Sequence, residues 1–278
     1  MTVHPDPAKL TQVTRALRAA GRKIALIPTM GALHEGHLEL IRHAKRVPGA
    51  VVPVVSIFVN PLQFGPNEDL SRYPRPLEDD LAACREEGVE LVFTPQAEDM
   101  YPPGSDTVVG PGALGTELEG ASRPGHFAGV LTVVAKLFHI VGPDVAMFGE
   151  KDYQQLVLVQ RMVRDLHFPL SVVGVPTVRE PDGLALSSRN VYLSTEDRAR
   201  ATVLSRALAE GAGVSARGAQ AVVERAREVL ATEPDVDVDY LELRAPDLGP
   251  VPDGGDARLL VAARLGTTRL IDNCAVSL

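Results

Sequence analysis

Apolar and polar residues alternate in two ways along the first two-thirds of the chain. Short runs rich in β-branched residues predict buried strands, and longer segments with apolar residues three or four positions apart predict helices. Regular alternation of the two predicts a parallel sheet with helices on both faces. The predicted strands are Lys23–Thr29, Ala50–Val59, Val89–Thr94, Asp144–Phe148 and Leu170–Val178, and the predicted helices are His34–Val47, Leu77–Glu87, His126–Val141 and Asp152–Leu166.

Two details of this pattern carry predictions of their own. Pro53 lies within the second strand and has no backbone N–H, which indicates a bulge, an edge position or a late start. The acidic pair Glu86–Glu87 at the end of a helix predicts a solvated helix face.

The pattern changes after Val178. A polar loop is followed by two predicted helices and three strand-like runs, the last two separated by a Leu-Gly-Thr turn that predicts a hairpin. We therefore predict an α/β domain over residues 1–178 and a smaller α+β domain over residues 179–278. The C-terminal elements are the loop Arg179–Asn190, the helices Thr195–Glu210 and Ala219–Thr232, and the strands Val236–Arg244, Arg258–Arg264 and Thr268–Val276.

Composition narrows the class of protein. The 278 residues include 28 Lys and Arg against 36 Asp and Glu, a formal charge of −8, and 45% are hydrophobic. The hydrophobic fraction excludes wholesale disorder, and the acidic balance argues against broad binding to nucleic acid or to an anionic membrane. No apolar run reaches the roughly 20 residues of a membrane-spanning helix, and the N-terminal sequence does not resemble a secretory signal. Cys84 and Cys274 form no disulfide or metal pattern, so we expect a reduced, cytoplasmic protein.

Two motifs resemble known functional patterns but do not have the features that those functions require. Gly110-x-Gly112-x-x-Gly115 matches a dinucleotide-binding pattern, but Pro111 removes a backbone donor and no acidic residue follows at the required distance, which favours a plain turn. The His34-Glu35-Gly36-His37 spacing is i, i+3 with an internal glycine, which argues against a zinc protease.

The segment Pro28–His37 (PTMGALHEGH) carries the strongest signal. A buried strand ends at Thr29, and a helix begins near His34, so its unpaired N–H groups and positive dipole end make an anion site. Two histidines one turn apart share a face and can bind a polyphosphate, while Gly36 lets a nucleotide approach the backbone. The alternative is that His37, in register with Leu40, is a core histidine. The pair, the glycine and the preceding strand together favour the functional interpretation.

A second candidate, Phe148–Gln155 (FGEKDYQQ), again follows a strand and opens a helix. Lys151 would place a cation beside helix N–H groups, which suits phosphate, and Asp152 can accept from ribose hydroxyls. Gln155 stands one turn beyond Lys151. The alternative is a solvated first turn whose acidic residues cap the helix.

Two further motifs are weaker alone. Asn60-Pro-Leu-Gln63-Phe follows the Ala50–Val59 strand, and its amides could bind a polar substrate or form only a turn. Leu186-Ser-Ser-Arg189 in the interdomain loop offers two hydroxyls and a guanidinium, either as a phosphate clamp or as a polar linker. Three of the four motifs follow strand ends, which is where open α/β sheets bind ligands.

Taken together, five sequences resemble the pantoate–beta-alanine ligase family of the nucleotidyltransferase superfamily: PTMGALHEGH, FVNPLQF, GEKDYQQLV, VPTVRE and LSSRN. The resemblance runs from about Gly21 to the C-terminus. It implies a Rossmann-like, doubly wound N-terminal domain, a small C-terminal lid domain, a homodimer, and a reaction that uses ATP and Mg²⁺.

The resemblance also implies roles for particular residues. His37 matches the catalytic histidine of the family, and His34 and Lys151 match its phosphate ligands. Arg189 is assigned with them to the stabilisation of charge on phosphate. Pantoate would be bound by Gln63 and Gln155, with Asn60 and Tyr73 in the same substrate site and β-alanine arriving near Gln63. No protein ligand of a metal is assigned. ATP would contact Met30, Gly31, His34, Gly36, His37, Gly149, Glu150, Lys151, Asp152, Val178, Leu186, Ser187, Ser188 and Arg189.

The implied chemistry suits such residues. An ionised carboxylate attacks the α-phosphorus of ATP without a base, so catalysis consists of positioning and charge stabilisation, and an amine then displaces AMP. Two alternatives stay open. One is an adenylyltransferase of the same superfamily that stops at nucleotide transfer, and the other is a non-catalytic nucleotide sensor. AMP release that requires both pantoate and β-alanine would distinguish them.

Overall fold

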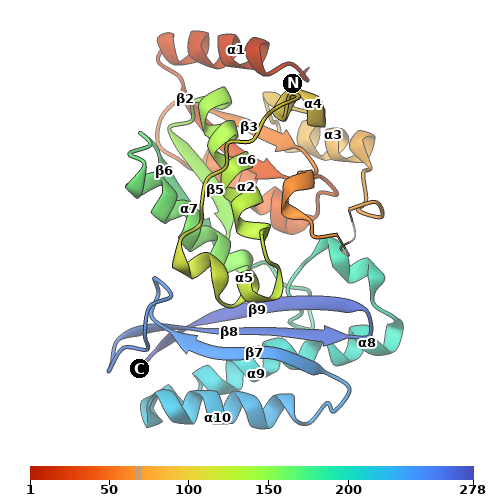
Figure 1. The fold of residues 1–278 in the computed structure, drawn as a ribbon, viewed down its shortest axis with the longest axis vertical. Helices are drawn as coiled ribbons and strands as arrows, with labels where there is room; N and C mark the ends of the chain where they lie inside the picture. Colours follow the sequence, from red (N-terminus) through yellow and green to blue (C-terminus); the bar gives the residue numbers. More distant parts are fainter. Residues whose placement is uncertain (67, 69) are drawn as a thin grey trace. The chain divides into compact units, whose positions relative to one another are not determined.

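The computed structural model describes residues 1–66, 68 and 70–278 and consists of two compact units (Figure 1). The first unit comprises residues 1–150 and 155–176, and the second comprises residues 151–154 and 177–278. The sequence pattern places the change of domain after Val178, and the structure divides the chain between residues 176 and 177. The short segment 151–154 belongs with the second unit, which no sequence pattern indicated.

A six-stranded parallel sheet forms the centre of the first unit, in the order β1-β4-β3-β2-β5-β6. From β2 the chain winds outward through β3 and β4, and from β5 it winds the other way to β6. The winding therefore reverses between β2 and β5, and open α/β sheets bind ligands at the carboxyl ends of the strands at this point. The strands are β1 (Thr2–His4), β2 (Lys23–Thr29), β3 (Val51–Ile57), β4 (Leu91–Phe93), β5 (Val145–Gly149) and β6 (Ser171–Val175).

Helices cover both faces of this sheet, which confirms the doubly wound prediction (Figure 1). On one face α2 (Glu35–Lys45) and α3 (Leu77–Glu86) bury Ile41 and Leu81 in a cluster that includes Val175 of β6. Gly174, the residue before Val175, faces Leu156 of α7 (Tyr153–Asp165). Because neighbouring residues of a strand point to opposite faces of the sheet, α7 covers the other face. The remaining helices of this unit are α1 (Pro7–Ala19), α4 (Ala97–Met100), α5 (Glu119–Ser122) and α6 (His126–Val141), with 3₁₀ turns η1 (Pro61–Gln63), η2 (Ala113–Thr116) and η3 (Glu150–Asp152).

Pro53 is the third residue of β3, which lies inside the sheet, so the edge position is wrong. Phe58 N–H donates to the carbonyl of Thr29 in β2 (3.1 Å), so even-numbered residues of β3 direct their N–H groups to β2. The nitrogen of Pro53 therefore faces β4, whose pairing with β3 begins only at Val54 with Leu91. Of the three explanations for Pro53, the late start is therefore correct, and it concerns only the edge of β3 that pairs with β4.

The strand β1 and the helices α1, α4 and α5 were not predicted from the sequence pattern. Asp6 caps α1 by accepting from Ala8 N–H (2.8 Å), and proline follows at the first helical position. The single helix expected over Thr195–Glu210 is wrong, because it is divided into α8 (Thr195–Arg200) and α9 (Thr202–Ala212). The Thr202 hydroxyl donates to the carbonyl of Ala199 (2.8 Å) and so competes with the helical backbone pattern there.

The second unit contains the predicted α+β arrangement. Its antiparallel sheet has the order β7-β8-β9, and α9 and α10 (Ala219–Leu230) pack their apolar faces, including Leu204 and Val222, against Leu259 and Val261 of β8. The predicted hairpin is confirmed by continuous pairing between β8 and β9. The other elements are β7 (Asp237–Arg244), β8 (Asp256–Leu265), β9 (Thr268–Ser277), and the 3₁₀ turns η4 (Ser188–Tyr192) and η5 (Ser215–Arg217).

Both cysteines are free thiols, one buried and one partly exposed. Cys84 on α3 is fully buried, and the Cys274 thiol on β9 donates to the carbonyl of Leu208 (3.6 Å). Burial raises the pKa of each thiol to about 11. Within the described part of the chain, no helix is both long enough and apolar enough to cross a membrane.

Candidate active site

The turn from β2 to α2 has a backbone conformation that few sequences adopt. Gly31 and Ala32 both have positive φ, +81° and +50°. Asp80 of α3 holds this turn, because its carboxylate accepts from Ala32 N–H (3.0 Å) and Leu33 N–H (2.7 Å). Any side chain at position 31 would meet that carboxylate, since a Cβ there would lie 2.8 Å from Asp80 Oδ2. Burial raises the pKa of Asp80. Sequence reasoning missed Asp80, because only the fold brings α3 to this turn.

His34 and His37 lie together at the start of α2, with ring centroids 4.1 Å apart. His34 caps the helix, and its Nδ1 accepts from Gly36 N–H (3.2 Å), while His37 Nδ1 accepts from His34 N–H (3.2 Å). A ring nitrogen that accepts a hydrogen bond carries no proton, so the neutral rings carry their protons on Nε2. Both histidines are thus oriented as Nε2–H donors beside a helix N-terminus. His37 is only partly buried, which does not suit a core histidine.

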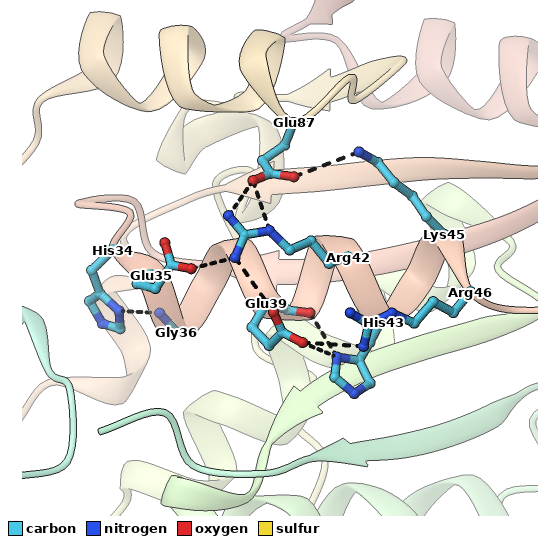
Figure 2. A network of polar contacts seen from close by, with 9 residues as sticks. All are labelled: His34, Glu35, Gly36, Glu39, Arg42, His43, Lys45, Arg46 and Glu87. Carbon is cyan, nitrogen blue, oxygen red and sulfur yellow. Dashed lines mark hydrogen bonds and ion pairs between the residues drawn. The ribbon is translucent and has the colours of Figure 1, made fainter. Parts of the chain in front are cut away.

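Beyond its first turn, α2 is joined to α3 by a network of charged side chains (Figure 2). Arg42 donates to Glu87 through Nε (3.0 Å) and Nη2 (2.6 Å), and Lys45 lies 3.7 Å from the same carboxylate. The prediction of a solvated face at Glu87 is therefore wrong, because the side chain is only 16% exposed and is paired across two helices. The network fixes the helix that carries both histidines.

A second group of residues surrounds the short turn η1, which follows β3. Asn60 caps this turn, and its Nδ2 donates to Gln63 Oε1 (3.0 Å) and to the carbonyl of Gly129 (3.1 Å). Its Oδ1 accepts from Leu62 N–H (3.3 Å) and from Tyr101 Oη (2.7 Å). Both N–H groups of the Asn60 amide and two acceptor positions of its oxygen are thus used within the protein, and one of these contacts orients Gln63.

Gln63 is held at both ends. Its Nε2 donates to Met30 Sδ (2.9 Å), which joins the η1 turn to the β2–α2 turn. Its backbone carbonyl accepts from His126 Nδ1 (2.8 Å) and Arg123 Nη2 (3.3 Å), and Arg123 in turn pairs with Glu68 through Nε (2.7 Å). Burial, and then the Arg123 cation, lowers the pKa of His126 to about 4, which keeps this ring neutral at pH 7. Sequence analysis had indicated no role for Arg123 or His126.

Helix α6 touches the η1 turn directly, and Gly129 makes this contact feasible. A Cβ at position 129 would lie 2.2 Å from the carbonyl oxygen of Leu62 and 2.7 Å from the nitrogen of Gln63. Both distances are far below van der Waals contact, so the backbone of η1 and the helix meet only because glycine stands here. Tyr73, predicted in the substrate site, is buried with its ring edge against Phe64 (5.8 Å between centroids).

Lys151 lies in η3, directly before α7, and belongs to the second unit. Its backbone carbonyl accepts from Asn273 Nδ2 of β9 (2.9 Å). The neighbouring predicted residues divide between the units: Gly149 ends β5 in the first unit, Asp152 is exposed in the second, and Gln155 is half-buried in α7 of the first. The helix expected from Asp152 begins one residue later, because η3 precedes it.

The loop after residue 176 is closed by its own hydrogen bonds. Leu186 N–H donates to the carbonyl of Val178 (3.0 Å), and Arg179 pairs with Ala185 in an isolated antiparallel bridge. Ser187 caps η4 by accepting from Arg189 N–H (3.2 Å), an arrangement that leaves the hydroxyl proton of Ser187 as a donor. Leu186, Ser187, Ser188 and Arg189 are all half-buried within the second unit.

The geometry of the first unit defines a class of protein. The turns that follow β2 and β5 lie at the carboxyl ends of the two strands where the sheet winding reverses. At one of them a helix N-terminus lies beside two imidazoles whose Nδ1 atoms accept from the backbone. This is the arrangement with which α/β proteins bind the phosphates of nucleotides.

Comparison with known proteins identifies the family. The model of the pantoate–beta-alanine ligase family matches residues 2–275. The chain is 66% identical over 278 residues to the pantothenate synthetase of Saccharopolyspora erythraea, covering all of this chain and 92% of the relative. It is also 66% identical over 276 residues to the pantothenate synthetase of Mycolicibacterium smegmatis, covering 99% of this chain and 88% of the relative.

Solved structures agree. The pantothenate synthetase of Thermus thermophilus superimposes with a TM-score of 0.90 at 51% identity, covering 99% of both chains. The pantoate–beta-alanine ligase of Francisella tularensis, solved in complex with β,γ-ATP and β-alanine, gives a TM-score of 0.81 at 34% identity and covers 99% of this chain and 97% of its own. The chain belongs to the pantoate–beta-alanine ligase family and is therefore an enzyme, a ligase that joins pantoate to β-alanine.

Proposed function

We propose that the enzyme condenses (R)-pantoate with β-alanine in two steps. The pantoate carboxylate attacks the α-phosphorus of ATP, which forms pantoyl adenylate and releases pyrophosphate. The amine of β-alanine then attacks the acyl carbon, which forms pantothenate and releases AMP. The observation that carries this proposal is the pair of Nε2–H donors that His34 and His37 present at the start of α2.

The first step needs charge stabilisation more than acid–base chemistry. A carboxylate is ionised at pH 7, so no enzyme base is required, while negative charge grows on the phosphate oxygens. We assign the stabilisation of that charge to His37, His34, Lys151 and Arg189. The N-terminal dipole of α2 adds to it.

ATP binding is proposed to draw on both units of the chain. In the first unit, Asp80 accepts the N–H groups of Ala32 and Leu33 and so fixes the turn, and the donors proposed for phosphate are the two imidazoles beside the positive end of α2. In the second unit, the capped loop around Ser187 and the segment around Lys151 offer hydroxyl and cationic donors. The proposed ATP contacts are Met30, Gly31, His34, Gly36, His37, Gly149, Glu150, Lys151, Asp152, Val178, Leu186, Ser187, Ser188 and Arg189.

The substrate acid is proposed to bind at Gln63. Met30 Sδ is a weak acceptor for one N–H of the Gln63 amide, which has a second N–H to offer to pantoate. Gln155 contributes the other amide, and β-alanine arrives near Gln63. Asn60 positions Gln63, and Tyr73 packs against Phe64 in the same proposed substrate site.

Magnesium is proposed to enter with ATP as part of the substrate. Among the described residues, no group of three or more His, Cys, Asp or Glu side chains is placed to hold a metal ion. Mg²⁺ commonly binds through substrate phosphates and water, with few protein ligands. When bound, Mg²⁺ supplies positive charge to the phosphate oxygens.

The two-step reaction is tested by isotope exchange. We expect labelled pyrophosphate to exchange into ATP when pantoate is present and β-alanine is absent, because pantoyl adenylate forms reversibly before the amine is needed. Exchange that strictly requires β-alanine would favour a concerted ternary reaction. AMP release should require both substrates, whereas a plain adenylyltransferase would accumulate an adenylylated product and a nucleotide sensor would release nothing.

Replacing the two glutamines is expected to impair the use of pantoate. In Gln63→Ala and Gln155→Ala, a buried polar group of pantoate loses its partner, which costs roughly 1–3 kcal/mol, or about one order of magnitude or more in KM for pantoate. Binding of ATP, measured by calorimetry, should change little. Gln160→Ala, at an exposed position of the same helix α7, serves as the control. Normal pantoate saturation in both site variants would contradict the assignment.

We further propose a cytoplasmic homodimer with no nucleic-acid or membrane partner. The net charge of −8 and the two free thiols support this proposal, and the dimer rests on the family resemblance. Sedimentation at micromolar concentration is expected to give twice the mass of one chain, and a monomer would refute the dimer.

A further inference from the structure

Lys151 lies in a segment of four residues that the second unit holds through polar contacts. Asn273 on β9 is buried, with 3% of its surface exposed, and its Nδ2 donates to the backbone carbonyl of Lys151 (2.9 Å). The next residue but one, Tyr153, donates its hydroxyl to the carbonyl of Pro246 (2.9 Å). Both ends of the Lys151–Tyr153 stretch are thereby tied to the unit that contains β9.

Arg258 fixes the side chain that makes the first of these ties. It is buried, with 9% of its surface exposed, and its Nε donates to Asn273 Oδ1 (2.7 Å). Its guanidinium carbon lies 4.0 Å from the centroid of the Tyr153 ring, a cation–π contact. Because the oxygen of the Asn273 amide is engaged by Arg258, its nitrogen must face Lys151.

The same strand also holds the loop that carries Arg189. Asp272, next to Asn273, is 4% exposed and accepts from Arg179 Nη1 (2.6 Å) and Nη2 (2.9 Å), at the start of the Val178–Arg189 loop. Two consecutive residues of β9 thus reach the two segments of this unit that carry its proposed cationic groups. Buried polar contacts of this kind define one geometry rather than merely adding stability.

We propose that Asn273 is a positioning residue for Lys151, with Arg258 holding Asn273 in the required orientation. Asn273 fixes the peptide of Lys151, so that the ammonium group starts from a defined backbone position when it stabilises charge on phosphate. This inference rests on the proposed role of Lys151. It gives the C-terminal unit a direct part in the adenylation step.

The test is a double-mutant cycle on pantoate-dependent adenylation, measured in single turnover with the full chain. Asn273→Asp keeps an oxygen for Arg258 but replaces the donor to Lys151 by a second oxygen. A small displacement of a catalytic group can lower the rate about 10²-fold, so we expect Asn273→Asp to slow adenylation by about ten- to a hundredfold. Combined with Lys151→Ala, it should add no further loss, because its effect acts through the Lys151 side chain.

Thermal unfolding and a matched control separate positioning from stability. Asp239→Asn removes an ion pair with Arg269 (2.5 Å) between β7 and β9, so it should lower the midpoint of unfolding without slowing adenylation. If Asn273→Asp does not fold, Asn273→Ser, whose short side chain cannot reach the Lys151 carbonyl, takes its place in the cycle.

Each result is decisive. A slow Lys151→Ala beside a normal Asn273 variant would overturn this inference alone. Losses that multiply in the double variant would also overturn it, because Asn273 would then act elsewhere. A normal Lys151→Ala would overturn the proposed role of Lys151 and this inference with it. Two slow single variants and a double variant no slower than Lys151→Ala are the expected result.

Discussion

His37→Ala is expected to slow pantoyl adenylate formation by about 10²–10³-fold, the usual loss when one donor to a developing oxyanion is removed. Stability should fall by only about 1 kcal/mol, because the ring is partly exposed, although it gives up the hydrogen bond from His34 N–H to Nδ1. The measurements are single-turnover adenylation and thermal unfolding on the same preparation.

His43→Ala is the matched control for this experiment. His43 lies on the same helix, and its ring contacts Glu39 Oε1 (3.1 Å) within the charged network of Figure 2. Its loss should leave the adenylation rate unchanged. A folded and fully active His37→Ala enzyme would contradict the catalytic role, whereas an unstable variant with normal activity per folded molecule would mean that His37 serves the core.

Gly129→Ala is expected to have the largest effect on stability. Its Cβ would lie 2.2 Å from the carbonyl oxygen of Leu62, so α6 and the η1 turn must separate. We expect a loss of about 3 kcal/mol in the free energy of unfolding, at the upper end for overpacking. Because the separation displaces Gln63, folded enzyme should also show a raised KM for pantoate.

Gly213→Ala is the control for the substitution itself. Gly213 has right-handed helical dihedrals at the end of α9, and a Cβ there would come no closer than 3.4 Å to other atoms. It should be neutral or slightly stabilising, because alanine loses less conformational entropy than glycine. Urea unfolding that shows equal stability for Gly129→Ala and the native chain would mean that the contact between α6 and η1 yields without strain.

The sequence pattern is most reliable where one element buries one continuous apolar surface. β2 and α6 have the predicted bounds, Lys23–Thr29 and His126–Val141, because their apolar runs begin and end beside glycine or polar residues. The parallel sheet with helices on both faces follows from alternation alone. Three of the four candidate motifs were recognisable because each comes directly after a strand, so that local sequence and sheet geometry point to the same edge.

The parts that sequence reasoning missed depend on contacts between distant segments. Asp80 reaches a turn 47 residues earlier in the chain, and Asn273 reaches a carbonyl 122 residues earlier. Neither has a local pattern, since an aspartate in a first helical turn and an asparagine in a strand are ordinary. Asn60 has a local pattern, since it follows a strand, but its contact with Gln63 was not predicted from that pattern.

The state of the two native thiols makes this chain suitable for site-directed labelling. Burial raises the pKa of Cys84 and Cys274 to about 11, so both are mainly unreactive thiols at neutral pH, and Cys84 has no exposed surface. A maleimide dye should therefore react with newly introduced surface cysteines well before it reaches the native ones. Such a cysteine can therefore be labelled with no native cysteine removed beforehand.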